Sequence, residues 1–377
     1  MDSYLGSRAP RRLFAAAGTG LGLANGVFTG IEVDVAPPLQ APPPAVDRLA
    51  VTVVTDSYHH NFEPSGRFGT VAVERFQLPP TSDPPRRVLQ NEWGLSLHVE
   101  SVLGDEARRV LVDFGYTHET LANNLELIGI DVARLDALVL SHGHYDHFGG
   151  MAGFLVAHRR KLKPALPLYL GGEECFCARE TGSPEAPRNF GVLDRRRIAE
   201  ANLRVLFADR PALLAGHGFT SGWIPKVSFE TPAQPSRMRV GLDADGLGCA
   251  AARLPLEKRS ATLLVDDFQH EIASCYHVKD RGLVVMTSCG HRGVVNTVMA
   301  AKAVSGITRV HAIIGGFHIM PMPADYAQRT AQALAELEPD FLIPMHCSGE
   351  TFIEAAKAAL PGKVLRNSTG TRFVFGA

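Results

Sequence analysis

From residue 51 onward, short apolar runs alternate with segments of helical periodicity. The runs are rich in β-branched residues and end at Gly, Pro or polar residues, which is typical of strands. They predict strands at 51–55, 94–99, 109–113, 137–141, 283–287, 309–314, 341–345 and 371–375. Apolar residues three and four apart predict helices over 119–128, 294–304, 325–337 and 351–360. The alternation of strands and helices indicates an α/β fold.

Residues 1–45 depart from this pattern. Arg11-Arg12 precedes a mildly apolar, Ala/Gly-rich stretch, and five prolines follow between residues 37 and 44. Paired arginines before a mild hydrophobic region resemble a twin-arginine signal, which the export machinery reads. The alternative is a cytoplasmic leader with a chance Arg pair. We therefore expect a leader and stiff Pro-rich linker over 1–45, a domain over 46–377, and a periplasmic or exported protein.

A second departure lies at about 175–260, which is rich in Pro, Gly and Arg and has little periodicity. We expect this region to be an insertion, or a lid, within a single catalytic domain. It begins with Cys175-Phe176-Cys177, whose spacing is wrong for a redox pair of the CxxC type. These two cysteines are predicted to be structural or incidental.

Composition and charge exclude several classes of protein. With 45% hydrophobic residues and a net charge of -1, the chain is too apolar and too balanced to be disordered. The balance of 38 basic and 39 acidic residues also argues against nucleic acid as a partner. No uncharged apolar run approaches the ~20 residues that a membrane span needs. Six cysteines in 377 residues are too few for a disulfide scaffold.

The densest chemistry follows the apolar run 137–141 (ALVLS), which has the composition of a strand buried on both faces. The next residues include four potential metal ligands: His142, His144, Asp146 and His147. Neutral imidazole and carboxylate are ligands for Zn²⁺, Mn²⁺ or Fe. A polar loop with scattered histidines is the alternative, but three His and an Asp packed this tightly after a buried strand favour a metal site.

Three further histidines, His291, His318 and His346, each follow an apolar strand. Any one of them alone would more often be structural. Together they suggest that one edge of a sheet is lined with ligands, since sites in α/β proteins favour strand ends. Cys289 and Cys347 adjoin two of these histidines, and we expect them to pack beside the site rather than bind metal.

The run 142–147 (HGHYDH) matches the HxHxDH signature of the metallo-β-lactamase superfamily. The segments 94–97 (GLSL), 288–291 (SCGH), 315–318 (GGFH) and 346–349 (HCSG) resemble its dihydropterin phosphate synthase-like branch. This resemblance, over about 51–375, implies an αββα sandwich with a metal site at the loop edges of the sheets. The enzyme that names the branch joins a dihydropterin diphosphate to a ribofuranosyl-aminobenzene phosphate and releases diphosphate.

The resemblance also implies a ligand set for two divalent metal ions, Zn²⁺ first, with Mn²⁺ or Fe as alternatives. One ion would be held by His142, His144 and His291. The other would be held by Asp146, His147 and His346. Most of the superfamily has a bridging Asp where this chain has His318, so we expect His318 to act in substrate binding or proton transfer, or as an alternative ligand.

Further roles are assigned to individual residues. Asp146 is a candidate to position the nucleophile, or to act as general base where one ion is absent. Lys226 follows Ile-Pro, where the branch often has a basic residue, and is a candidate to bind a substrate phosphate. Asp113 is expected to be structural near the site. The stretch 266–271 (DDFQHE) has His270 where the branch usually has an acid.

Three functions remain open at this point. Two cations that share a water lower its pKa, and the resulting hydroxide can hydrolyse a small, phosphorylated or pterin-like substrate. Alternatively, the cations hold a departing diphosphate while a substrate carbon attacks, as in the transferase that names the branch. The third possibility is a non-catalytic metal or ligand sensor on the same fold. The intact ligand set favours an enzyme, and the expected export favours hydrolysis.

Overall fold

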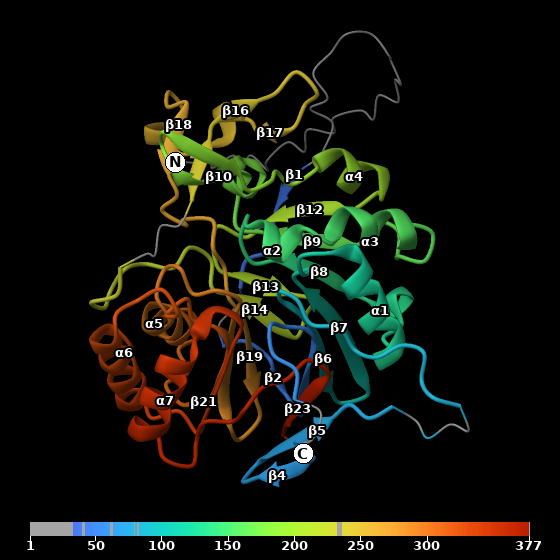
Figure 1. Ribbon diagram of the computed structural model, residues 1–377, viewed down its shortest axis with the longest axis vertical. Helices are drawn as coiled ribbons and strands as arrows, with labels where there is room; N and C mark the ends of the chain where they lie inside the picture. The colour runs from blue at the N-terminus through green and yellow to red at the C-terminus, as the bar shows by residue number, and fades with distance from the viewer. Residues whose placement is uncertain are drawn as a thin grey trace, which may run out of the picture.

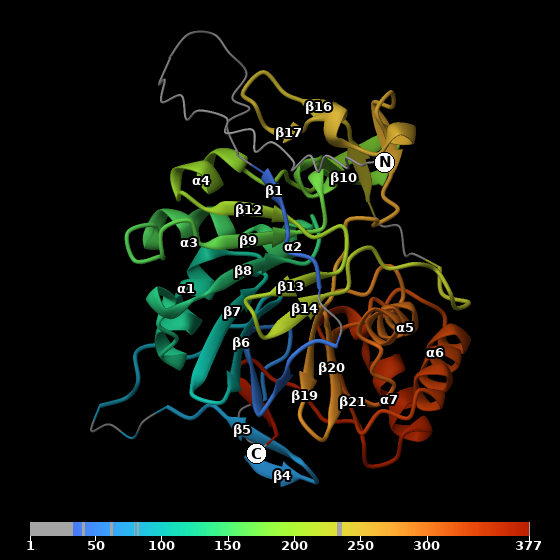
Figure 2. The same cartoon turned by 180° about the vertical axis from the view of Figure 1, so that it is seen from behind.

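The structure is a computed structural model that describes residues 33–39, 42–60, 63–78, 80, 83–231 and 236–376. Two large sheets are stacked face to face, and helices cover the outer face of each (Figure 1). The view from behind shows the same four layers (Figure 2). The chain therefore has the predicted αββα sandwich. Arg11 and Arg12 lie outside the described residues.

The first sheet has ten strands, and its members come from both ends of the chain. Its order is β1 (Val33–Val35), β12 (Arg204–Phe207), β9 (Pro167–Leu170), β8 (Ala137–Leu140), β7 (Glu106–Val112), β6 (Ser96–Leu103), β3 (Arg48–Thr55), β23 (Thr371–Phe375), β5 (Val71–Arg75) and β4 (Gly66–Phe68). Strands β7, β8, β9 and β12 are parallel, so the loops that follow them share one edge of the sheet.

The second sheet has seven strands. Its order is β13 (Ala212–Leu214), β14 (Gly218–Thr220), β19 (Ser274–Val278), β20 (Gly282–Thr287), β21 (Val310–Gly316) and β22 (Phe341–Met345), with β2 (Ala45–Val46) paired to β19. Strands β20, β21 and β22 are parallel. Their carboxyl ends therefore meet at one edge as well.

Helices α1 (His118–Ile128), α3 (Met151–His158) and α4 (Arg195–Glu200) cover the first sheet, and α5 (Val294–Ser305), α6 (Ala324–Glu336) and α7 (Glu350–Ala359) cover the second (Figure 1). One apolar cluster fills the space between the sheets, and one lies under each helical layer. Strand β8 contributes side chains to two of these clusters. Ala137 and Val139 belong to the central cluster, and Leu138 and Leu140 belong to the cluster under the helices of the first sheet. This alternation confirms the prediction of a strand buried on both faces.

All the strands and helices predicted from periodicity are present, and each end lies within four residues of its predicted place. None of the helices in the described ranges combines the length and apolar character that crossing a bilayer requires.

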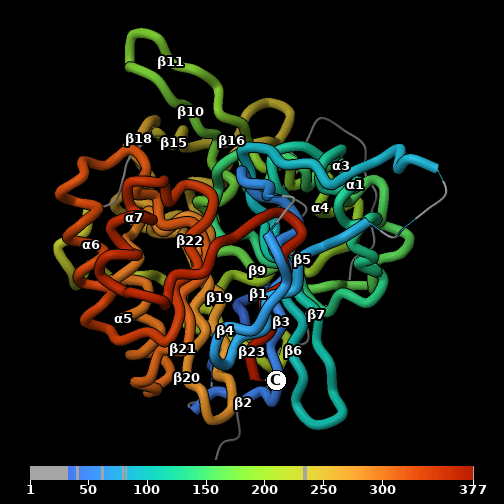
Figure 3. The backbone as a smooth tube through the Cα atoms, turned by 60° about the horizontal axis from the view of Figure 1, so that its bottom comes forward, coloured from blue at the N-terminus to red at the C-terminus, as the bar shows by residue number. Residues whose placement is uncertain are grey.

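The region 175–260 is not one separate insertion. Strand β12 lies within the first sheet, and β13 and β14 lie within the second. The remainder forms a four-stranded sheet of β11 (Ala186–Asn189), β10 (Ala178–Ser183), β15 (Arg237–Arg239) and β18 (Leu263–Val265), and a small pair of β16 (Gly241–Leu242) and β17 (Gly248–Cys249). The hairpin of β10 and β11 projects from the body of the molecule (Figure 3).

The described part of the predicted linker belongs to the fold. Strand β1 pairs in parallel with β12, and the Leu213 amide donates to the Pro37 carbonyl at 2.9 Å. Ala36 is buried in the central cluster, and Ala45 begins β2. Within the described residues, paired structure is therefore already present at Val33, before the predicted boundary at residue 46. Proline-rich sequence is compatible with this path, because β1 and β2 are short strands with the prolines between them.

Candidate metal centre

The predicted ligands gather where the edges of the two sheets meet. His142 and His144 follow β8, and Asp146 and His147 lie on the short helix α2 (Tyr145–Phe148). His291 follows β20. His346 follows β22 and begins a 3-10 turn that ends at Ser348. Parallel strands bring these loops to one place although they are far apart in sequence.

Among the described residues the potential ligands form four overlapping groups, and two of these are the predicted sets, which we call the first and second ligand groups. The other two are His142, His147 and Cys289, and Cys289, His318 and Cys347. The ligand atoms of His142, His144 and His291 lie within 4.8 Å of one another, and so do those of Asp146, His147 and His346. All six residues are buried. The structure thus brings together the same two sets that the resemblance implied.

The histidines of the first group are held in their neutral form. Burial lowers the pKa of His142 and His291 well below the ordinary value, and the neighbouring imidazoles lower it further. Burial also lowers the pKa of His144 to about 3, although the charge of Asp146 opposes this shift. A neutral imidazole has a lone pair to offer, which is the form that binds a metal ion.

Hydrogen bonds assign the tautomers of His142 and His147. The Ser141 hydroxyl donates to Asp113 Oδ2 at 2.7 Å, so its oxygen accepts from Nδ1 of His142 at 2.9 Å. The Asp113 carboxylate also accepts from Nδ1 of His147 at 2.8 Å. The Nε2 atoms of both histidines are buried and without a hydrogen-bond partner, and so face the group with a free lone pair.

His144 makes its hydrogen bond through Nε2, whereas His142 and His147 make theirs through Nδ1. Its Nε2 lies 2.8 Å from the Ser236 hydroxyl, which is buried and also lies 3.5 Å from Asp266 Oδ2. Because the carboxylate takes the hydroxyl proton, Nε2 is the donor and Nδ1 carries the lone pair. His142 and His147 therefore present Nε2 to the centre, whereas His144 presents Nδ1.

The second group contains the negative charge. Burial alone would raise the pKa of Asp146, but His147 and His346 hold it below its usual range. Asp146 Oδ2 lies 3.3 Å from His346 Nε2 and 3.8 Å from His147 Nε2. Burial favours the neutral form of His346, but the charges of Cys347 and Asp146 raise its pKa to about 9. Without a cation, a proton on His346 neutralises this carboxylate.

These observations test whether a metal fits the residues present. Asp146 Oδ1, both nitrogens of His291 and both nitrogens of His346 are buried without hydrogen-bond partners in the described chain. Leaving buried polar atoms unpaired costs about 1–3 kcal/mol each. A cation bound to each group would take one nitrogen of each of these imidazoles and a carboxylate oxygen of Asp146, and the set of imidazoles with one carboxylate suits Zn²⁺. The residues therefore fit divalent metal ions.

His318 belongs to neither group. It is half-buried, its Nδ1 lies 3.4 Å from Cys289 Sγ, and its backbone N–H donates to Cys347 Sγ at 3.2 Å. Its φ of 46° is in the left-handed region, which His adopts only a few per cent of the time. Its ring centroid lies 4.1 Å from that of His291. His318 therefore lies at the edge of the metal centre, next to the buried thiols of Cys289 and Cys347.

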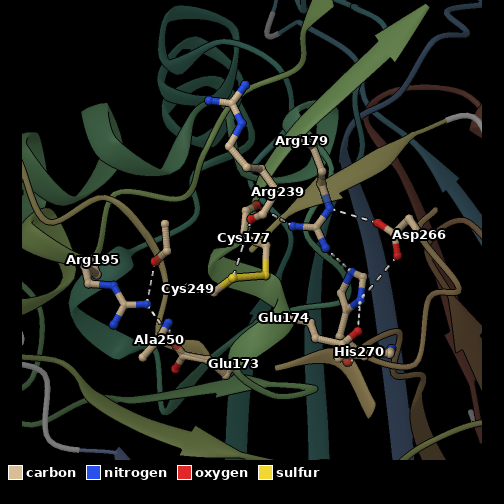
Figure 4. Close-up of a disulfide and its surroundings, with 12 residues drawn as sticks. Glu173, Glu174, Cys177, Arg179, Arg195, Arg239, Cys249, Ala250, Asp266 and His270 are labelled. Carbon is tan, nitrogen blue, oxygen red and sulfur yellow. Dashed lines mark hydrogen bonds and ion pairs between the residues drawn. A yellow bond between two sulfur atoms is a disulfide. The ribbon is translucent and has the colours of Figure 1, made fainter. Parts of the chain in front are cut away.

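Residues of the stretch 266–271 contact His291 of the first group. The Phe268 ring stacks on His291 with centroids 4.0 Å apart, and the Glu271 carboxylate accepts the backbone N–H of His291 at 2.9 Å. His270, the departure noted in the sequence, belongs to neither ligand group. Its Nε2 lies 3.0 Å from Arg179 (Figure 4). Arg179 in turn donates to Asp266 at 2.9 Å. This network fixes the loop that holds His291.

A disulfide joins Cys177 to Cys249, 72 residues further along the chain (Figure 4). Cys175 is free and buried. Of the two predicted alternatives, structural or incidental, the disulfide supports a structural role for Cys177. The bond links the start of the four-stranded sheet to strand β17.

Lys226 is exposed. The backbone beside it is held in place, because the Val227 N–H donates to Asn296 Oδ1 at 2.8 Å. The predicted contact of Lys226 with a substrate phosphate stays a prediction.

Trp93 and Ser236 carried no signal in the sequence, and Phe268 was noticeable only as part of the stretch 266–271. Trp93 is 47% exposed, and its ring centroid lies 5.0 Å from that of His346, so it forms a solvent-facing wall beside the second group. Its place in a polar loop carried no periodic signal. Ser236 and Phe268 lie about 90 and 120 residues beyond the HxHxDH run, and only the folded chain brings them to it.

Comparisons with known proteins agree with this architecture. A sequence model of the metallo-β-lactamase superfamily matches residues 99–162. The crystal structure of Tm1679, described as a metal-dependent hydrolase of the β-lactamase superfamily, superposes with a TM-score of 0.62 at 20% identity, covering 86% of this chain and 98% of that one. This likeness shows the fold.

A curated relative from Methanocaldococcus jannaschii is 25% identical over 290 residues, which cover 73% of this chain and 90% of the relative. It is named 7,8-dihydropterin-6-methyl-4-(β-D-ribofuranosyl)-aminobenzene-5'-phosphate synthase. The similarity therefore extends well beyond the metal-binding run, and it agrees with the branch suggested by the sequence motifs.

Proposed function

Because the chain belongs to the metallo-β-lactamase superfamily, we propose that it is a metal-dependent enzyme that hydrolyses a small, phosphorylated or pterin-like molecule. The observation that carries this proposal is the pair of buried ligand groups. Among the described residues, Nε2 of His142, Nε2 of His147 and the ring nitrogens of His291 and His346 have no hydrogen-bond partner there. His142, His144 and His291 would hold one divalent ion, and Asp146, His147 and His346 the other. Such ions, when bound, supply Lewis acidity and activate water.

The chain's own residues would orient the ligands and move a proton. Asp113 and Ser141 hold the imidazoles of His147 and His142 in one tautomer. His318 is half-buried beside the centre, where its imidazole could donate a proton to a departing oxygen or accept one from water. Trp93 gives the substrate an apolar wall, which a planar ring would cover best.

Hydrolysis in an oxidising compartment is favoured over a biosynthetic step by two features. The Arg11-Arg12 leader resembles a twin-arginine signal. Cys177 and Cys249 form a disulfide, which persists in secreted and periplasmic proteins and is rare in the cytosol. We accordingly propose that the protein is exported through the twin-arginine machinery.

A transferase is the second candidate, because similarity to the pterin-related synthase covers 90% of that relative. In this reaction a substrate carbon, rather than water, would displace diphosphate. The ligand groups serve both reactions, so only the nucleophile differs.

One assay separates the candidates. Protein loaded with Zn²⁺, Mn²⁺ or Fe²⁺ is offered phosphodiesters, lactones, thioesters and a dihydropterin diphosphate, with and without the aminobenzene ribofuranosyl phosphate. A hydrolase cleaves one of these without the acceptor, whereas a transferase releases diphosphate only when the acceptor is present. His142→Ala and His346→Ala should lose the activity. His277→Ala, which changes a partly buried imidazole on β19, is the matched control.

A further inference from the structure

Two free cysteines meet beneath the ligand groups. Cys289 lies in the loop after β20, and Cys347 lies in the loop after β22. Their Sγ atoms are 3.1 Å apart, and each residue is only 2% exposed. The other two free cysteines, Cys175 and Cys275, are buried elsewhere, in the 3-10 turn before β10 and in strand β19. The close pair is thus a feature of the metal centre.

The separation is suited to a covalent bond. A disulfide requires the sulfurs to be about 2.05 Å apart, so this pair needs to close by about 1 Å. Two thiolates on one Zn²⁺, at about 2.3 Å each in tetrahedral geometry, would instead need to be nearly 4 Å apart. The geometry therefore favours bond formation over a third metal held by Cys289, Cys347 and His318, although these three residues also lie within 4.8 Å of one another.

We propose that Cys289 and Cys347 are a site of oxidative modification, which a small peroxide converts to a disulfide. In the first step one thiol is oxidised to a sulfenic acid, and the peroxide is reduced to water or an alcohol. In the second step the other thiol attacks the sulfenic sulfur, the S–S bond forms, and water leaves. The two cysteines together lose two electrons and two protons to the peroxide.

A small oxidant can reach the pair, whereas a larger disulfide reagent is excluded. Both sulfurs are buried, and Gly316 packs closely against Cys347, since a Cβ added there would lie 2.9 Å from Sγ. A small cavity of about 10 Å³, room for about one water-sized molecule, is lined by Gly290, Phe317 and His318 among others and lies next to the loop that holds Cys289. Its size suits a peroxide rather than oxidised glutathione.

The bond would connect the two ligand groups. Cys289 lies two residues before His291, and Cys347 directly follows His346. A disulfide would therefore tie one ligand loop of each group to the other. This consequence rests on the proposed metal binding, whereas the oxidation itself does not. A disulfide between the two loops limits the conformations that they can adopt without metal. The oxidised protein should therefore lose its metal more slowly.

The test uses the full, metal-loaded chain. After treatment with hydrogen peroxide, free thiols are counted in denaturant and disulfides are mapped by mass spectrometry of peptides. We expect thiols to fall from four to two, with a cross-linked peptide joining 289 to 347. Cys275→Ser, which removes a cysteine away from the site, should still form the cross-link and fall from three thiols to one.

Persistence of all four thiols, or oxygen added at Cys289 or Cys347 without the cross-link, would overturn the proposal. So would a metal ion lost on Cys289→Ser while His142 and His346 variants keep it. The second measurement is transfer of Zn²⁺ to a chelator from reduced and oxidised protein. Slower loss from the oxidised form supports the coupling between the groups, and equal rates overturn it.

Discussion

The carboxylate of Asp113 lies 2.8 Å from Nδ1 of His147, and both side chains are fully buried. The same carboxylate accepts the backbone N–H and the hydroxyl of Ser141, which precedes His142. Asp113 therefore orients a histidine in each ligand group without itself lying in either of them. Its φ of 60° aims the carboxylate back under the HxHxDH run.

We predict that Asp113→Asn weakens binding of the ion at the second group by about 10- to 100-fold, because the amide carries no charge to polarise His147. Competition with a chromogenic chelator measures this affinity. Asp136→Asn is the matched control. Asp136 directly precedes strand β8, whereas the HxHxDH run follows the other end of that strand, and the carboxylate of Asp136 accepts the Arg109 N–H. An affinity unchanged by Asp113→Asn would show that His147 does not need this partner.

The second prediction concerns pH. His346 has its pKa raised to about 9 in the metal-free protein, so below that pH a proton competes with the cation. Metal affinity at the second group should rise with pH up to about 9, and Zn²⁺ added at pH 7 should release a proton from His346. The stability of the metal-free fold changes with pH in the opposite direction to the metal affinity. A pKa raised above the unfolded value stabilises the protein below about pH 6.5, and this contribution is lost as pH rises through about 9.

Proton release on Zn²⁺ addition can be followed with a pH indicator in weak buffer. Burial opposes the high pKa of His346, and the charge of Cys347 is the largest cause that raises it. Cys347→Ser should therefore reduce the release at pH 7. Identical release by wild type and Cys347→Ser would mean that Cys347 carries no charge in the metal-free protein.

The third prediction concerns His318. Its side chain lies in neither ligand group, and its Nδ1 is turned toward Cys289. His318→Asn should therefore keep both ions while turnover falls by about 10²–10⁴-fold, which is typical of losing a general acid or base. Asn also tolerates the left-handed backbone found here. Metal content measured beside the pH–rate profile tests this, and loss of an ion on His318→Asn or His318→Asp would make it a ligand.

The fourth prediction concerns the N-terminal segment. Removing residues 1–45 deletes β1, its pairing with β12 and the buried Ala36. This truncation should lower the melting temperature by a few degrees relative to a chain that begins at Val33, since each lost hydrogen bond is worth about 1 kcal/mol. Calorimetry of the two truncations decides the point. Equal melting temperatures would show that residues 33–45 do not stabilise the domain, in agreement with a domain that begins at residue 46.

How far the sequence could predict this molecule depended on how local each signal was. The apolar run at 137–141 and the histidines after three later strands are local patterns, so the sheets and the ligand cluster could be predicted. The bond between Cys177 and Cys249 spans 72 residues and has no local signature. Asp113 reaches His147 through a left-handed turn, which an Asp–Phe–Gly sequence alone does not specify. Strands of two or three residues, such as β1 and β13, are too short for periodicity to reveal.

The central claim is that the two ligand groups each hold an ion. The most direct measurement is the metal content of chelator-stripped protein reloaded with Zn²⁺, for wild type, His144→Ala, His346→Ala and the His277→Ala control. We predict two ions per chain for wild type and His277→Ala, and one or fewer for each of the other two variants. Two ions retained by both His144→Ala and His346→Ala, or none bound by wild type, would contradict the account.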